Sequence, residues 1–198
     1  MTVTIEERKL IYSSRKEAKK ASAAMSYGEF VGDVITTWLV ERESRDRLMR
    51  LEADFIYRDP QGREWLAPKG RTVNGASIPV FLWGPVIGSP YTGSFRRASV
   101  VHDIAEEDRK RPSREVHRMF YQAMRCDDTE PWLAGVIYAA VRVFGEKWDI
   151  PQGIAMQQTQ GNIAAFLEMI HSPEFAKEES MDAMDSRLED FISQRLKR

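Results

Sequence analysis

The spacing of apolar residues changes along this chain, and the change limits the folds that the chain can adopt. Between residues 30 and 67, β-branched and aromatic residues form short clusters such as Phe30-Val31, Val34-Ile35 and Trp38-Leu-Val40. Such clusters are typical of strands, and the sequence predicts one strand through residues 30–40. Beyond Pro90 the apolar residues recur every three or four positions, which is the repeat of a half-buried helix. The sequence therefore predicts an α+β fold: a small antiparallel sheet, then a helical bundle or hairpin with extra C-terminal helices.

Turn-forming and helix-capping residues divide the chain further. Asp59-Pro-Gln-Gly62 favours a turn between strands at Leu51–Tyr57 and Arg63–Ala67. Helices are expected around residues 97–108, from Ser113 through at least Met124, from Trp132 to Phe144, and at roughly 153–170 and 178–196, with Ser113 as the N-cap of the second. We interpret residues 1–27 as an N-terminal arm or peripheral helix, 28–149 as the α+β core and 150–198 as a C-terminal helical extension.

The last expected helix has an apolar stripe formed by Met181, Met184, Leu188, Phe191 and Ile192. Asp182, Asp185, Glu189 and Arg195 are expected on its opposite, polar face. A stripe of this kind must be buried. It either docks onto the chain's own helices or forms a surface for a partner or a second copy of the chain. The second alternative is open because apolar residues recur seven positions apart in this helix, a spacing that suits helix pairing.

Charge and composition exclude some classes of protein. The 198 residues carry a formal net charge of −1, which argues against bulk electrostatic binding of nucleic acid. No apolar run approaches the roughly 20 residues of a membrane span, and charged residues interrupt any signal-peptide core at residues 6–9. The single cysteine excludes an internal disulfide. We expect a cytoplasmic protein.

Two of the three histidines, His102 and His117, lie in the expected helical hairpin. At about 1.5 Å per residue they stand at similar heights on either side of the connection, and both can face one groove. Asp103 follows His102 directly, about 100° further around the helix. We predict that these three side chains line one polar pocket, as metal ligands or catalytic groups, with Asn74, Ser77 and Arg97 as substrate-binding residues.

Imidazole and carboxylate ligands suit zinc, manganese or iron, and a partly open site can activate water. The alternative is structural: a helix histidine among valines is often a half-buried residue with a hydrogen bond to the backbone. Glu106, Glu107 and Asp108 are expected to form a solvated helix end. A serine triad is disfavoured because Pro79 stands where Gly-x-Ser-x-Gly needs its second glycine.

Several short motifs together resemble domain-of-unknown-function family 1353, which occurs in phages, prophages and bacteria. The resemblance covers roughly residues 28–148 and is carried by Gly28…Trp38-Leu39, Phe55-Ile-Tyr57 with Gly62, Pro68-x-Gly70, Thr72-Val-Asn-Gly-Ala-Ser-Ile-Pro79, Val100-Val-His-Asp103, Met119-Phe-x-x-Ala-Met124 and Phe144-Gly145…Trp148. It implies a compact α+β domain in a phage or prophage setting, without an established activity. The sequence departs from the family pattern at Asn74 and His117, where an Asp is usual, and at Ile104-Ala105-Glu106.

Two hypotheses of function remain open. The first is a phage-associated, metal-dependent hydrolase that acts on a cell-wall or phosphoester substrate, with a zinc, manganese or iron ion held by His102, Asp103 and His117. The second is a non-enzymatic phage accessory or binding protein whose polar pocket is structural. A phage or host protein is the expected partner, and the C-terminal helix is a candidate surface for a homo-oligomer.

Overall fold

The computed structural model describes residues 27–40, 48–75, 78–82, 94–149, 156–175 and 180–196. Strands in these residues form two antiparallel sheets of three strands each, in the orders β1-β4-β5 and β2-β3-β6. Their bounds are β1 Glu29–Val31, β2 Thr36–Trp38, β3 Met49–Leu51, β4 Phe55–Arg58, β5 Glu64–Ala67 and β6 Thr72–Val73. Together with the helices below, they confirm the predicted α+β class.

The stretch predicted as one strand is divided between the two sheets. β1 pairs with β4, with Phe30 opposite Tyr57, whereas β2 pairs with β3, with Trp38 opposite Met49. Gly32 lies between them at a φ of 84°, a backbone conformation that glycine adopts without strain. The sequence pattern shows β-branched residues on both sides of Gly32, but it does not show that the chain changes sheets there.

The predicted turn between β4 and β5 is confirmed. The Asp59 N–H donates to the Arg63 carbonyl at 3.0 Å, and Gly62 takes a φ of 77°. The buried Asp59 carboxylate organises the turn because it accepts hydrogen bonds from the backbone N–H groups of Gln61 and Arg63 and from Trp65 Nε1. The turn therefore places the inward side chains of β5 against the helices.

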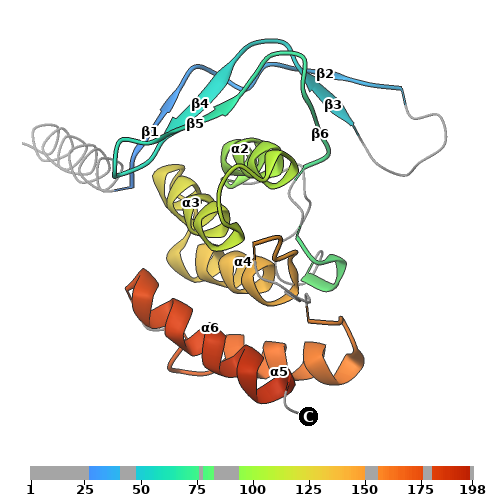
Figure 1. The fold of residues 1–198 in the computed structure, drawn as a ribbon, viewed down its shortest axis with the longest axis vertical. Helices are drawn as coiled ribbons and strands as arrows, with labels where there is room; N and C mark the ends of the chain where they lie inside the picture. Colours follow the sequence, from blue (N-terminus) through green and yellow to red (C-terminus); the bar gives the residue numbers. More distant parts are fainter. Residues whose placement is uncertain are drawn as a thin grey trace, which may run out of the picture.

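The helices lie beneath the sheets in successive layers (Figure 1), with α2 nearest the strands, α3 and α4 below it, and α5 and α6 furthest away. Their bounds are η1 Val80–Leu82, α2 Arg96–Asp108, α3 Ser113–Cys126, α4 Pro131–Phe144, α5 Gln160–Ile170 and α6 Met181–Leu196. Helix α4 is buried on nearly all sides because it lies between the α2–α3 hairpin and the last two helices. Within the described residues, no helix combines the length and apolar character needed to cross a bilayer.

Ser113 does not cap the second helix of the hairpin, contrary to expectation. It is the first residue of α3, and the preceding Pro112 occupies the cap position without a side-chain hydrogen bond. The Ser113 N–H instead donates to the Asp149 carboxylate at 2.9 Å. Trp148 Nε1 donates to the Arg111 carbonyl at 2.8 Å. These two bonds hold the segment after α4 against the α2–α3 connection.

The apolar stripe of α6 packs against the chain's own core, with Leu188 fully buried. The expectation of a solvent-facing Asp185 was wrong, because this side chain is also fully buried. Arg114 of α3 and Arg142 of α4 bond to its carboxylate at 3.0 and 3.3 Å, and the Tyr138 hydroxyl donates to it. Helix α6 is thus docked by apolar contacts around a buried ion-pair network.

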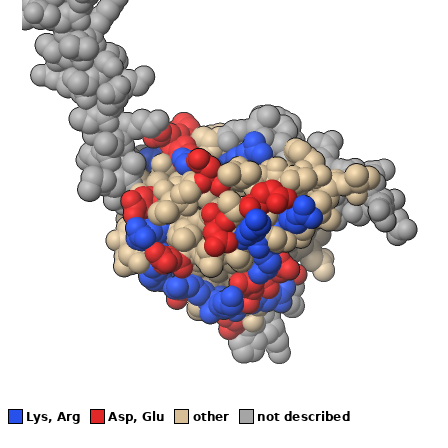
Figure 2. Space-filling model, turned by 90° about the horizontal axis from the view of Figure 1, so that it is seen from above, with Lys and Arg blue, Asp and Glu red and all other residues tan. Residues whose placement is uncertain are grey.

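On the face seen from above, Lys and Arg side chains lie beside Asp and Glu side chains (Figure 2). Within the first sheet, Arg58 of β4 contacts Glu29 of β1 and Glu64 of β5. Local pairing of opposite charges on this face is what a near-zero net charge leads one to expect.

Candidate functional site

The two histidines of the helical hairpin meet at the interface between α2 and α3. His102 Nε2 and His117 Nδ1 lie 3.1 Å apart, and both side chains are fully buried. Their ring centroids are 5.3 Å apart, and Phe120 stacks on His102 at 4.2 Å. The matched heights deduced from the sequence therefore do bring the two imidazoles to one place.

Burial lowers the pKa of His102 to about 3. The pKa of His117 is also lowered to about 3, chiefly by burial and further by the neighbouring His102. Both rings are consequently neutral near pH 7, and one donates the hydrogen bond that the other accepts. The remaining nitrogens, His102 Nδ1 and His117 Nε2, have no hydrogen-bond partner of normal geometry among the described residues.

A carboxylate stands next to this pair. Glu106 lies one helical turn after His102, and its Oε2 is 3.8 Å from His102 Nδ1. One potential ligand atom from each of His102, Glu106 and His117 lies within 4.8 Å of the other two. The expectation of Glu106 in a solvated helix end is corrected: its side chain is only 18% exposed. Because Glu106 follows His102 by four residues, the sequence itself indicates that both lie on one face of the helix.

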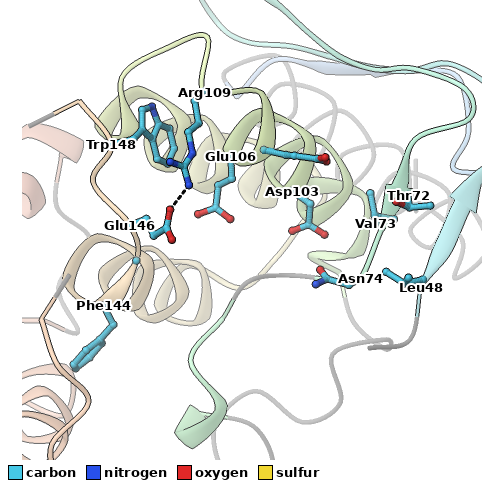
Figure 3. Close-up of a pocket in the computed structure, with 12 residues that line it drawn as sticks. Leu48, Thr72, Val73, Asn74, Asp103, Glu106, Arg109, Phe144, Glu146 and Trp148 are labelled. Carbon is cyan, nitrogen blue, oxygen red and sulfur yellow. Dashed lines mark hydrogen bonds and ion pairs between the residues drawn. The ribbon is translucent and has the colours of Figure 1, made fainter. Parts of the chain in front are cut away.

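The three residues adjoin a pocket with a volume of about 550 Å³ (Figure 3). Asn74 and Asp103 form part of its wall, and Glu106 lies beside Asp103 on α2. Arg109, Glu146 and Trp148 line another part. The segment with Glu146 and Trp148 is held there because Asp149 accepts a bond from the Ser113 N–H and Trp148 Nε1 donates to the Arg111 carbonyl. The histidines lie behind this wall rather than in it.

Gly145 lets the chain pass close to His117. A Cβ at this position would lie 2.3 Å from the Val141 carbonyl oxygen and 3.5 Å from His117 Nε2. Any larger residue would therefore displace the end of α4, because its Cβ would clash with this carbonyl. Because Gly145 also lines the pocket, only a thin wall at this point separates His117 from the cavity.

The structure brings some of the predicted site residues together and separates others. Asp103 and Asn74 line the pocket, but Asp103 is not part of the three-residue cluster, where Glu106 takes the place expected for it. Arg97 is absent from the pocket lining. Its guanidinium pairs with Asp127 and lies 4.5 Å from the Phe30 ring centroid. Ser77 lies outside the described residues.

Sequence reasoning missed Glu146 and Trp148 as pocket residues, although Trp148 was noted as a family feature. Both follow the end of α4 and reach the pocket only because this segment folds back onto the α2–α3 connection. The Arg109 guanidinium pairs with Glu146 and lies 5.7 Å from the Trp148 ring centroid. No local sequence pattern reports such a long-range contact.

Comparison with known proteins gives a family and no activity. Residues 49–141 match the family described as "Protein of unknown function (DUF1353)". The uncharacterized protein y4jT of Sinorhizobium fredii is 40% identical over 103 residues, which cover 52% of this chain and 30% of that protein. The uncharacterized protein y4iH of the same organism is 36% identical over 126 residues, which cover 60% of this chain and 52% of that protein. The aligned regions thus span about a third to a half of these relatives.

No solved structure matches the chain significantly. The matched region contains β3 to β6 and helices α2 and α3, and therefore every residue of the histidine–glutamate cluster. The family resemblance expected from the sequence motifs is confirmed over this region, in which residues 49–141 match the DUF1353 family.

Proposed function

We propose that the chain is a metal-dependent hydrolase whose ion is held by His102, Glu106 and His117. The observation that carries this proposal is the position of two imidazole nitrogens 3.1 Å apart, with the Glu106 carboxylate 3.8 Å from the other nitrogen of His102, directly behind a 550 Å³ pocket. Two histidines and one carboxylate are a common ligand set of catalytic zinc, which keeps a further position open for water.

The separation of the two nitrogens fits this ligand set. A tetrahedral zinc with Zn–N distances of about 2.0–2.1 Å holds two nitrogen ligands about 3.3 Å apart. The proton that the two rings share can thus be replaced by an ion with little movement of the helices. The lowered pKa of each imidazole supports binding as well, because only the neutral ring offers a lone pair to a metal.

The other pocket residues have roles that follow from their positions. An ion held by His102, Glu106 and His117 would lower the pKa of a bound water molecule, which would then serve as the nucleophile. Asp103 lines the pocket on the same helix and is the candidate to accept the proton of that water. Asn74 faces Asp103 from the end of β6 and offers an amide for substrate binding. Asn74 thus keeps the substrate-binding role predicted from the sequence, whereas Asp103, predicted as a metal ligand or catalytic group, keeps only the catalytic role in this proposal.

A phage or prophage setting belongs to the same proposal. In it the enzyme would act in the cytoplasm of the host cell, on a cell-wall or phosphoester substrate and with a phage or host protein as partner. The support is the family resemblance alone.

A structural role for the pair is the second candidate. The two rings already hydrogen-bond to each other, and Phe120 stacks on His102 at 4.2 Å. This arrangement also suits a buried polar pair that holds α2 against α3. In that case the chain is an accessory or binding protein, and metal content is the property that separates the two candidates.

The test is metal binding by protein that carries no polyhistidine tag. Elemental analysis and calorimetric titration with Zn²⁺, Mn²⁺ and Fe²⁺ should show one ion per chain, lost in His102→Ala and weakened in Glu106→Gln. His171→Ala is the matched control, because His171 is the exposed third histidine at the end of α5. Circular dichroism establishes that each variant is folded. The proposal is contradicted if the wild-type protein does not bind the metal. It is also contradicted if Glu106→Gln and His102→Ala bind it as strongly as the wild type.

A further inference from the structure

The imidazoles of His102 and His117 are fully buried, so an ion or a water molecule reaches them only if part of the surrounding structure moves. Two parts of the pocket wall lie next to them. Glu106 stands beside His102, with its Oε2 3.8 Å from His102 Nδ1. The segment after α4, residues 145–149, passes beside His117, and we call this segment the strap. Access to the histidines therefore depends on which of these two parts yields.

The strap lies between His117 and the pocket. A Cβ at Gly145 would be 3.5 Å from His117 Nε2, so the backbone at this point passes close to the imidazole. The Trp148 ring meets the His117 ring at a steep angle, with the ring centroids 6.1 Å apart. Gly145, Glu146 and Trp148 also line the pocket (Figure 3). Movement of the strap would thus open a path from the pocket to His117.

Few contacts hold the strap in place. Trp148 Nε1 donates to the Arg111 carbonyl at 2.8 Å, and the Ser113 N–H donates to the Asp149 carboxylate at 2.9 Å. Both bonds fasten the strap to the α2–α3 connection. None of its five residues is fully buried. A segment with few buried contacts opens at a lower free energy than the core of a protein. The strap can therefore move while the helices stay packed.

Glu106 is the less favourable route to the same place. In the proposed function its carboxylate is a metal ligand, so a rotation of Glu106 away from His102 would remove one of the three ligands. The strap supplies none of these ligands. It can move away from the α2–α3 connection and leave His102, Glu106 and His117 in position to receive the ion.

We propose that the strap is a gate that controls the access of metal ions and water to His117, with the bond from Trp148 to the Arg111 carbonyl as its latch. The gate opens at the end of α4, where Gly145 begins the strap. This inference rests on the proposed function and adds a conformational control of the same site. It makes the rate of access, rather than the affinity for the ion, the property that the strap determines.

The test measures how fast the buried imidazoles react with diethyl pyrocarbonate, which modifies neutral histidines, in the full chain without metal. Mass spectrometry gives the initial rate for each histidine, and the exposed His171 is the internal reference. Trp148→Phe keeps an aromatic ring and removes the latch. We expect it to raise the rate at His117 about fivefold relative to His171, the factor that corresponds to about 1 kcal/mol for one hydrogen bond.

Trp132→Phe is the matched control, because Trp132 Nε1 donates to the Ile170 carbonyl at 3.3 Å, a bond of the same kind between α4 and α5. It should leave the rate at His117 unchanged. General destabilisation would raise the rates at His102 and His117 alike, whereas opening of the strap raises the rate at His117 more. The inference is overturned if Trp148→Phe changes neither rate or both equally. It is also overturned if Glu106→Ala accelerates the reaction and Trp148→Phe does not.

A second variant tests the strap without altering its aromatic residue. Glu146 pairs with Arg109, and the two side chains are 70% and 52% exposed. Glu146→Gln removes this pair and should raise the rate at His117 about twofold, a small effect because water screens exposed charges. Added salt should raise the wild-type rate in the same direction and have less effect on the variant. A rate that is insensitive to both changes contradicts a gate fastened at this end.

Zinc kinetics separate the inference from the proposed function. Stopped-flow measurements with a coloured zinc indicator should show that Trp148→Phe raises the rates of zinc association and dissociation by the same factor, about fivefold, and leaves the dissociation constant nearly unchanged. If zinc does not bind but the reactivity of His117 changes as expected, the gate stands and the metal site fails. If zinc binds at equal rates in both proteins and the reactivity of His117 is unchanged, the metal site stands and the gate fails.

Discussion

Two helix interfaces of this molecule bury titratable side chains, and they differ in how completely those side chains are hydrogen-bonded. At the α3–α4–α6 interface, the buried Asp185 carboxylate receives bonds from Arg114, Arg142 and Tyr138. At the α2–α3 interface, His102 and His117 bond to each other, and one nitrogen on each ring has no hydrogen-bond partner of normal geometry within the part of the chain that the structure describes.

The difference separates a structural site from a candidate ligand site. Buried polar groups in proteins are nearly always satisfied, so exceptions call for an explanation. Asp185 satisfies this rule and joins three helices. The histidine pair does not, and it lies behind a pocket. We therefore expect changes at Asp185 to affect folding, and changes at the histidines to affect binding.

The largest effect is expected for Asp185→Ala. It leaves Arg142, which is only 5% exposed, without its buried partner. Removing one member of a buried ion pair costs about 3–5 kcal/mol of unfolding free energy, measurable by urea denaturation. Asp182→Asn is the control. Arg118 pairs with both Asp185 and Asp182, but the Asp182 side chain is 83% exposed. Equal losses in both variants would show that burial of Asp185 does not matter.

The second-largest effect is expected at the α2–α3 interface, where bound zinc should stabilise the folded protein. Zinc at about 100 times its dissociation constant should raise the unfolding free energy of the wild-type protein by about 2.7 kcal/mol. The double variant His102→Leu/His117→Leu should show no increase with zinc. Thermal melting with and without the metal measures this. The same variant should be about as stable as wild type without metal, because replacing both members of a buried hydrogen bond by apolar groups is nearly neutral.

The third effect is acid sensitivity at the histidine pair, measured in the presence of a chelator. Burial lowers the pKa of both rings to about 3, below the ordinary value of 6.5. The unfolded chain therefore binds protons first as the pH falls, and stability decreases below about pH 6.5. Two such rings contribute a loss of about 1–2 kcal/mol between pH 7.5 and pH 6. The double leucine variant should lose this part of the pH dependence, and an unchanged slope would mean that the rings are accessible to protons in the folded state.

The sequence predicts the part of the candidate site that depends on helical repeat alone. Matched heights along a hairpin place His102 beside His117, and this needs only the rise per residue and the position of the connection. Glu106 follows from the same geometry, since it lies at i+4 from His102. It was missed because Glu106-Glu-Asp108 has the composition of a solvated helix end.

The remaining features depend on contacts between distant segments. Glu146 and Trp148 reach the pocket because Asp149 binds the start of α3. Asp185 is buried because arginines of α3 and α4 surround it, although its own helix presents it among polar residues. In the same way, the division of residues 30–40 between two sheets depends on which strands pair with each half. Local patterns do not contain this information.

The smallest effect is expected for an ion pair whose two side chains are both exposed. Arg58 on β4 bonds to Glu64 on β5 at 2.9 Å, and their side chains are 40% and 55% exposed. Water and salt screen such a pair, so Glu64→Gln should cost about 0.5 kcal/mol or less in urea denaturation. The cost should decrease further in 0.5 M salt, where the screening length is shorter. A loss close to that of Asp185→Ala would mean that charge pairing itself, rather than burial, determines the stability of this fold. A negligible loss would leave burial as the property that gives Asp185 its structural role.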